Sequence, residues 1–102
     1  MEKAEKPPVV RGVLHRFPRA ILAIADLSAY GMKKHGINLA GTDHLVAEGD
    51  AEGQRLDALG RHLCMEAIHG PKNPDDQEFL HATQAAWNAL ARLELLLKAQ
   101  DE

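Results

Sequence analysis

The sequence predicts an all-α fold: a small helical bundle whose last two helices form an antiparallel hairpin. Alanine and leucine dominate the composition and only 4% of the residues are aromatic, which favours helices over sheets. Three stretches with helical periodicity are separated by breaks that contain glycine and proline. A chain of 102 residues suffices for one compact domain. Because so small a domain buries a modest share of its surface, we expect it to be completed by association into a homo-oligomer, a dimer or a tetramer.

The first helix is expected to begin at Pro18, because proline fits the first helical turn, where its missing N–H costs nothing. It should end before Gly36, which follows three basic residues. The preceding residues 1–16 are charged and contain two adjacent prolines, so they predict an N-terminal arm. Residues 17–102 then form a single helical domain.

Two further helices are predicted beyond a long connection. Residues 37–53 carry several glycines and no helical period, which indicates a loop. The second helix is predicted over about 51–69 and the third over about 76–98, with Asp75 or Asp76 capping the third. The apolar side of the third helix is expected to comprise Ala82, Ala86, Ala89, Leu90, Leu93 and Leu97.

Charge and composition disfavour several classes of protein. A formal net charge of −3 disfavours a nucleic-acid-binding protein, which needs a basic surface to displace counterions, so we expect no stable nucleic-acid partner. No apolar run approaches the ~20 residues of a membrane span. The single Cys64 cannot form an intramolecular disulfide, and no apolar leader opens the chain, so we expect a cytoplasmic location.

Polar side chains recur on one side of the third predicted helix. His81, Gln84 and Asn88 follow one another at steps of four or three residues, which places all three on a single face. On the second helix, His62 and Glu66 also share a face, because they are four residues apart. Polar groups on otherwise apolar helices need partners, so these faces predict a functional site.

The short hairpin link brings the end of the second helix close to the start of the third. Five titratable side chains are then expected within reach of one another: His62, Glu66, Asp75, Asp76 and His81. Carboxylates and imidazoles that converge between bundle helices build divalent-metal sites. Ordinary structural roles explain the same residues: a solvated glutamate, histidines satisfied in a core or interface, and aspartates that only cap a helix.

A second candidate cluster is the segment GMKKHGIN, residues 31–38. Lys33 and Lys34, followed by a flexible glycine, suit phosphate oxygens, although a cationic helix C-terminus is also favoured by the helix dipole. Arg61 adds another group that can bind phosphate, or it forms a surface pair with Asp57.

Several segments resemble the phage dATP/dGTP diphosphohydrolases of the MazZ type, which are related to the all-α MazG-like nucleoside triphosphate pyrophosphohydrolases. The resemblance spans about residues 17–97. The matching residues are Gly31, Lys34, Gly36 and Asn38 in the first segment, Ala58, Arg61, His62 and Leu63 in the second, and His81, Ala85, Ala86 and Asn88 in the last. The sequence departs from the family pattern at Gln84, usually a second histidine, at Leu39, often a tryptophan, and at Pro71, a glutamate.

The resemblance implies hydrolysis of a purine deoxynucleoside triphosphate, dGTP or dATP, to the monophosphate and pyrophosphate. For a phage-encoded chain this reaction would adjust the nucleotide pool of the host cytoplasm. The resemblance also implies Mg²⁺ or Mn²⁺ held by Glu66 and by Asp75 or Asp76, together with His81 or His62. Oxygen-rich surroundings favour these ions over zinc.

The resemblance assigns roles to further residues. Glu66, His62 and Arg61 are implied as catalytic, with Lys34 and Arg61 neutralising charge on the leaving pyrophosphate. The implied substrate contacts are Lys33, Lys34, Asn38, Gln84 and Asn88. The alternative function is a non-catalytic helical protein that binds nucleotides or forms an oligomeric interaction module. It is favoured by the absence, from the predicted helices, of the paired Glu-x-x-Glu motif typical of MazG enzymes.

Overall fold

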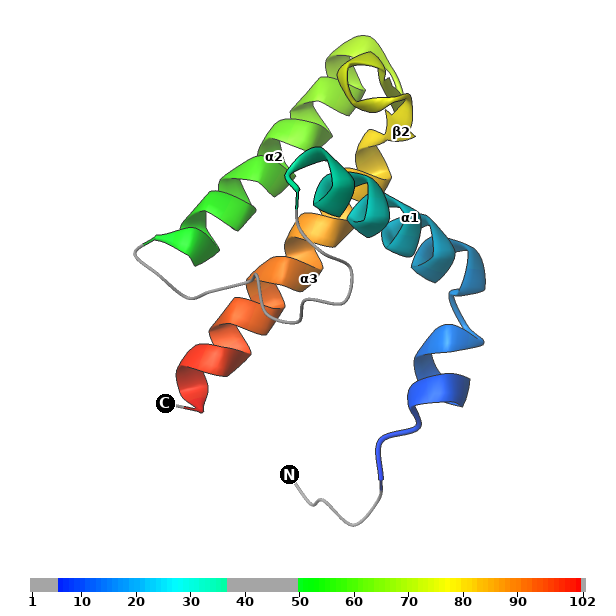
Figure 1. The fold of residues 1–102 in the computed structure, drawn as a ribbon, viewed down its shortest axis with the longest axis vertical. Helices are drawn as coiled ribbons and strands as arrows, with labels where there is room; N and C mark the ends of the chain where they lie inside the picture. Colours follow the sequence, from blue (N-terminus) through cyan, green and yellow to red (C-terminus); the bar gives the residue numbers. More distant parts are fainter. Residues whose placement is uncertain (1–5, 37–49, 102) are drawn as a thin grey trace.

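The fold is known from a computed structural model, which describes residues 6–36 and 50–101. Its elements in chain order are η1 (Val10–Leu14), α1 (Pro18–Lys34), α2 (Ala51–His69), β1 (Lys72–Asn73), η2 (Pro74–Asp76), β2 (Phe79–Leu80) and α3 (His81–Gln100). Helices α2 and α3 lie side by side and antiparallel, and α1 crosses over α3 (Figure 1). The predicted all-α class with a C-terminal helical hairpin is therefore confirmed, and the two short strands lie only in the hairpin turn.

The bounds of α1 follow from the residues at its ends. Pro18 occupies the first turn, as the sequence predicts. At the other end, the backbone N–H of His35 donates to the carbonyl of Gly31, and Gly36 then takes a φ of 72°. A positive φ is readily adopted by glycine, so Gly36 ends the helix for a stereochemical reason.

Residues of the predicted N-terminal arm contain a short helical segment. Val10–Leu14 forms one π-helical stretch, closed by a 2.8 Å hydrogen bond from the His15 N–H to the Val10 carbonyl. None of its residues is buried, so the segment adds little to the core. The division at residue 16 stays a prediction.

The connection between α2 and α3 differs from its prediction. α3 begins at His81, not near residue 76, so the expected capping by Asp75 or Asp76 is wrong. The two aspartates belong instead to η2, which Pro74 initiates and in which the Asn73 side chain accepts a hydrogen bond from the Asp75 N–H. The chain reverses at this turn, before α3 begins, because β1 and β2 pair on either side of it.

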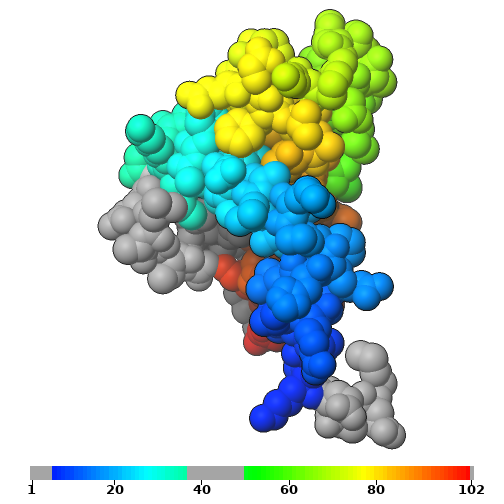
Figure 2. Space-filling model, turned by 90° about the vertical axis from the view of Figure 1, so that its right-hand side faces the viewer, coloured from blue at the N-terminus to red at the C-terminus, as the bar shows by residue number. Residues whose placement is uncertain are grey.

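Backbone geometry explains why helix α3 starts late. Gln77 and Glu78 have φ values of 51° and 65°, in the left-handed region that an α-helix cannot contain. Lys72 pairs with Leu80 and Asn73 with Phe79 on either side of this reversal. In Figure 2 the resulting turn, drawn in yellow, rests directly against the cyan end of α1. The hairpin turn therefore supplies residues to a surface that it shares with α1.

The buried side of α3 is the polar side, which corrects the expected apolar side. The buried residues of α3 are His81, Thr83, Gln84, Ala85, Asn88, Ala91 and Leu95. By contrast Leu90, Leu93 and Leu97 keep about half of their surface exposed, at 49%, 51% and 47%. Alanines and mutually bonded polar groups allow close approach of three helices, so the bulky leucines face outward.

The exposed leucines of α3 favour the predicted homo-oligomer, because a row of large apolar side chains on one face is typical of an interface. We expect the purified chain to elute as an oligomer in size-exclusion chromatography with light scattering, and Leu93→Glu to shift it to the monomer. Ala99→Glu adds the same charge on another side of the helix and should leave the oligomer intact. A monomeric wild-type chain would contradict the prediction.

Within the described residues, the longest and most apolar helices still fall short of what crossing a lipid bilayer requires.

Candidate functional site

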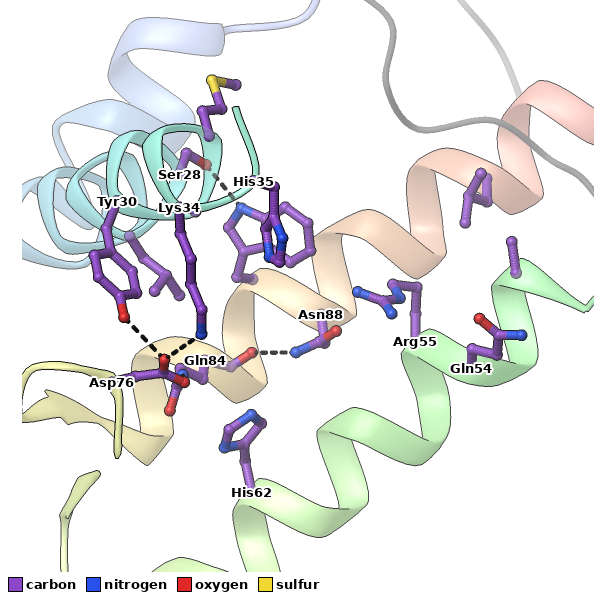
Figure 3. A pocket seen from close by; sticks show the side chains of 16 residues that line it. Ser28, Tyr30, Lys34, His35, Gln54, Arg55, His62, Asp76, Gln84 and Asn88 are labelled. Carbon is purple, nitrogen blue, oxygen red and sulfur yellow. Dashed lines mark hydrogen bonds and ion pairs between the residues drawn. The ribbon is translucent and has the colours of Figure 1, made fainter. Parts of the chain in front are cut away.

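A cavity of about 390 Å³ lies where α1, α2, α3 and the hairpin turn meet. Figure 3 shows its lining side chains, which approach from all four segments. The polar and aromatic groups that line it are Ser28, Tyr30, Lys34, His35, Gln54, Arg55, His62, Asp76, Gln84, Trp87 and Asn88. This concentration of polar groups in a fold with so small an apolar core makes the cavity the candidate functional site.

Asp76 connects the turn to α1 at the edge of this cavity. Its Oδ1 accepts hydrogen bonds from the Tyr30 hydroxyl at 3.0 Å and from the Lys34 ammonium at 2.9 Å. The Lys34 hydrogen bond is the main cause that holds the pKa of Asp76 below its usual value, against the opposing effect of burial. The same contact raises the pKa of Lys34. Asp76 is therefore a carboxylate and Lys34 a cation across the neutral pH range.

Gln84 extends this network into the interior. Its Nε2 donates to Oδ2 of Asp76 at 2.9 Å, and its Oε1 accepts from Asn73 Nδ2 at 2.9 Å. The side chain is buried, so both ends of the amide need these partners. Asp76 Oδ2 also lies 3.5 Å from Asn73 Nδ2. An amide suits this position because it offers a donor and an acceptor together.

His62 of α2 and His81 of α3 face each other beside this network. Their Nδ1 atoms are 3.1 Å apart, so one ring donates the shared proton and the other accepts it. Burial is the main cause that lowers the pKa of His62, and the neighbouring His81 lowers it further. His62 is therefore neutral at neutral pH and lines the cavity as a base. The convergence of these two histidines was predicted from the hairpin geometry and is confirmed.

Trp87 also lines the cavity. Its indole Nε1 donates to Ser28 Oγ at 2.7 Å, which joins α3 to α1. Tyr30 packs against Phe79 of β2 with ring centroids 5.3 Å apart, which joins α1 to the hairpin turn. The cavity is therefore held by contacts between residues far apart in the sequence.

Comparison with known families decides the affiliation of the chain. The family described as dATP/dGTP diphosphohydrolase, N-terminal, matches residues 1–102. The chain belongs to the dATP/dGTP diphosphohydrolase family. No curated protein matches it, and neither does any solved structure. The family name gives dATP and dGTP as substrates and a hydrolase as the class of enzyme.

The cavity of this diphosphohydrolase family member contains some of the predicted site residues and not others. Lys34, His62, Asp76, Gln84 and Asn88 all line it. Other predicted residues are placed elsewhere in the described structure: Lys33 is exposed on α1, and Arg61, Asp75 and His81 line a second hollow, which His62 also borders. Asn38 lies outside the described residues.

Glu66 stands apart from the aspartates with which it was grouped. It is half-buried on α2, lines neither hollow, and its side chain makes no hydrogen bond or ion pair with another described residue. Within residues 6–36 and 50–101, no three histidine, cysteine, aspartate or glutamate side chains are arranged to hold a metal ion. Both oxygens of Asp76 already accept hydrogen bonds, one of them from an ammonium group. Glu66, Asp75 and Asp76 therefore do not form one group of ligands among the described residues, and the Mg²⁺ or Mn²⁺ site stays a prediction.

Arg55 is the main site residue of this family member that the sequence analysis missed. It lines the cavity on α2, seven residues before His62. Seven residues are two helical turns, so the spacing already places both on one face and could have identified Arg55. Trp87, by contrast, carried no such signal, because an aromatic residue in an alanine-rich helix is ordinarily a core residue.

The lowered pKa of His62 predicts a loss of stability in mild acid. The unfolded chain takes up a proton near the usual pKa of 6.5, before the folded chain does, so unfolding gains protons as the pH falls below that value. The melting temperature of the wild type should therefore drop between pH 7 and pH 5, and His62→Gln should flatten that drop. The exposed His69→Gln on the same helix is the control and should retain the wild-type slope. Equal slopes for wild type and His62→Gln would refute the prediction.

Proposed function

We propose that this chain hydrolyses dATP or dGTP to the monophosphate and pyrophosphate. The observation that supports the proposal is that one cavity is lined by the cationic side chains of Lys34 and Arg55, by the neutral imidazole of His62 and by the aromatic rings of Tyr30 and Trp87. Its volume of about 390 Å³ falls in the range of small-molecule sites, roughly 300–1,000 Å³. Family membership supplies the substrate class, and the cavity offers groups suited to it.

The proposed reaction needs a proton acceptor and positive charge. Water attacks the α-phosphorus, the bond from that atom to the oxygen bridging the α- and β-phosphates breaks, and the oxygen leaves with pyrophosphate. His62 takes the proton of the attacking water, because its lowered pKa keeps it neutral and its Nδ1 is oriented by His81. Lys34 and Arg55 offset the negative charge that grows on the leaving group.

The proposal leaves the dependence of the reaction on a metal ion to measurement. Mg²⁺ or Mn²⁺ would neutralise phosphate charge in such a reaction. Since the described carboxylates Glu66, Asp75 and Asp76 do not lie together as one group, no step is assigned to an ion. Comparing turnover with Mg²⁺, with Mn²⁺ and with a chelator measures the dependence directly.

The decisive experiment is release of pyrophosphate from each of the four deoxynucleoside triphosphates by the purified chain. We expect release from dATP or dGTP; no release from either purine substrate would leave the non-catalytic nucleotide-binding protein as the better description. His62→Gln and Glu66→Ala then compare two of the residues that the resemblance implies as catalytic. The cavity favours His62, so His62→Gln should reduce kcat more than Glu66→Ala does, while both variants stay folded by circular dichroism.

Two arginines of α2 form a matched pair that tests the position of the site. Arg55→Met should reduce kcat/KM by about 10- to 100-fold, because a lost charge-assisted contact is worth about 1.5–3 kcal/mol. Arg61→Met removes the same group from a residue that lies outside this cavity, and it should change kcat/KM by less than about threefold. A larger loss for Arg61→Met than for Arg55→Met would place the phosphates in the second hollow instead.

A further inference from the structure

We propose that Oδ1 of Asn88 accepts a hydrogen bond from the nucleoside half of the bound nucleotide. The donor is either an N–H group on the purine base or the 3′-hydroxyl of the deoxyribose. This inference rests on the proposed function, because it assumes that the cavity takes a nucleotide. It adds an orientation: the sugar and base lie against the middle of α3.

The observation behind this inference is an unpaired polar atom. Asn88 is only 6% exposed and lines the cavity. Its Nδ2 donates to the backbone carbonyl of Gln84 at 2.8 Å, which fixes which end of the amide is the oxygen. Oδ1 is enclosed and has no hydrogen-bond partner among the described residues. Since buried acceptors are nearly always paired, this oxygen needs a partner that the described residues do not supply.

Because Oδ1 of Asn88 is a hydrogen-bond acceptor, only those parts of a nucleotide that carry a donor can pair with it. Phosphate oxygens at neutral pH carry negative charge and only accept, so they are repelled by Oδ1. Hydrogen-bond donors on a purine deoxynucleotide are found on the base and on the sugar. In Figure 3 the oxygen of Asn88 lies at the end of the amide opposite the nitrogen bonded to Gln84. The Trp87 ring, adjacent in sequence, offers a flat wall of the same cavity for stacking of a base.

A ligand can reach this oxygen because the side chains across from it are not tied down. Gln54 and Arg55 line the same cavity from α2. Within the described residues, neither side chain has a hydrogen bond or an ion pair. Either can move aside without breaking a polar contact. In contrast, Gln84 and Asp76 are held by several hydrogen bonds and form the fixed side of the cavity.

The test measures binding without turnover, so that its result is independent of hydrolysis. Calorimetric titrations of wild type and Asn88→Leu use dAMP, 2′,3′-dideoxy-AMP, the deoxynucleotide of unsubstituted purine, and pyrophosphate. Asn88→Leu should weaken dAMP about tenfold, the usual effect of one neutral hydrogen bond, and leave pyrophosphate unchanged. Either 2′,3′-dideoxy-AMP or the deoxynucleotide of unsubstituted purine should bind wild type about tenfold more weakly than dAMP does. The affinity of that analogue should not fall further in Asn88→Leu. Loss with the dideoxy analogue identifies the sugar hydroxyl as the donor, and loss with the unsubstituted purine identifies the base.

The melting temperature of Asn88→Leu provides the second readout. Removing an unpaired buried acceptor while keeping the branched shape of the side chain should leave the melting temperature unchanged or raise it. The Gln84 carbonyl keeps its partner, since it also accepts the helical N–H of residue 88. Unchanged dAMP affinity, an equal loss for pyrophosphate, or equal wild-type affinity for dAMP and both analogues would each overturn the inference. If dAMP binds as expected but no triphosphate is hydrolysed, only the proposed function fails.

Discussion

Replacing Asp76 with alanine should lower the free energy of unfolding by about 3 kcal/mol, because hydrogen bonds to a charged group are worth about 1.5–3 kcal/mol. The variant loses the acceptor for Tyr30, Lys34 and Gln84 at once. It leaves the Nε2 of buried Gln84 without its partner, and it removes the hydrogen bonds that join α1 to the hairpin turn. Urea denaturation measures the difference. For a small domain whose total stability is about 5–15 kcal/mol, this is a large fraction.

Asp75 provides a matched control for this prediction. Its side chain is exposed, and only its backbone N–H takes part in the turn, so Asp75→Ala should change the free energy of unfolding by less than about 0.5 kcal/mol. The pH dependence supplies a further check. The lowered pKa of Asp76 means that its contribution is complete above the usual value of 3.8 and is lost as the pH falls through its lower folded value. The gap between wild type and Asp76→Ala should therefore close in acid. Equal effects of the two substitutions at neutral pH would contradict the network.

Among substitutions that keep the size of the replaced side chain, Gln84→Glu should lower the free energy of unfolding the most. It replaces the donor Nε2 with an oxygen that faces Asp76 Oδ2 across a gap of 2.9 Å in the wild type. Two carboxylates at this distance repel each other, and the position is buried, so water does not screen them. We expect a loss of at least about 3 kcal/mol in the free energy of unfolding at pH 7.

The Gln84 variants also predict a reversal with pH that a packing defect would not show. At about pH 5 the introduced carboxyl takes up a proton, since a neighbouring carboxylate and burial both raise its pKa, and it then donates to Asp76. Gln84→Glu should therefore recover part of its melting temperature relative to wild type on acidification. Gln84→Met, of similar length and without charge, should lose stability by an amount that does not recover. Parallel pH profiles for the two variants would show that charge is not the cause.

The positions of some site residues could be predicted from local sequence pattern, and those of others could not. His62 and His81 meet because an antiparallel hairpin with a short link leaves few other positions for them, so spacing alone was sufficient. Asp75 and Asp76 are adjacent, and no local pattern distinguishes them. The structure does so through α1, because Tyr30 and Lys34 reach only Asp76. That contact spans more than 40 residues of sequence, so no local pattern reveals it.

The side of α3 that is buried was predicted wrongly for a related reason. Periodicity separates Leu90, Leu93 and Leu97 from the polar face, but it does not say which face meets the other helices of the same chain. Gln84 and Asn88 enter the interior because partners from the turn and from the helix backbone satisfy their amides. Leu90, Leu93 and Leu97 therefore lie on the surface, where contacts in the predicted homo-oligomer would bury them.

By itself, the sequence determined the three helices, the hairpin, the pairing of the two histidines and, through its resemblance, the family. These depend on helical periodicity, on glycine and proline at helix ends, and on short links, all of which act over a few residues. Only the tertiary structure decided that α3 starts at His81, that Asp76 and not Asp75 joins the cavity, and that Arg55 and not Arg61 lines the same cavity as Lys34. Those outcomes depend on how α1 crosses α3, a packing choice that distant side chains make together and that no local pattern encodes.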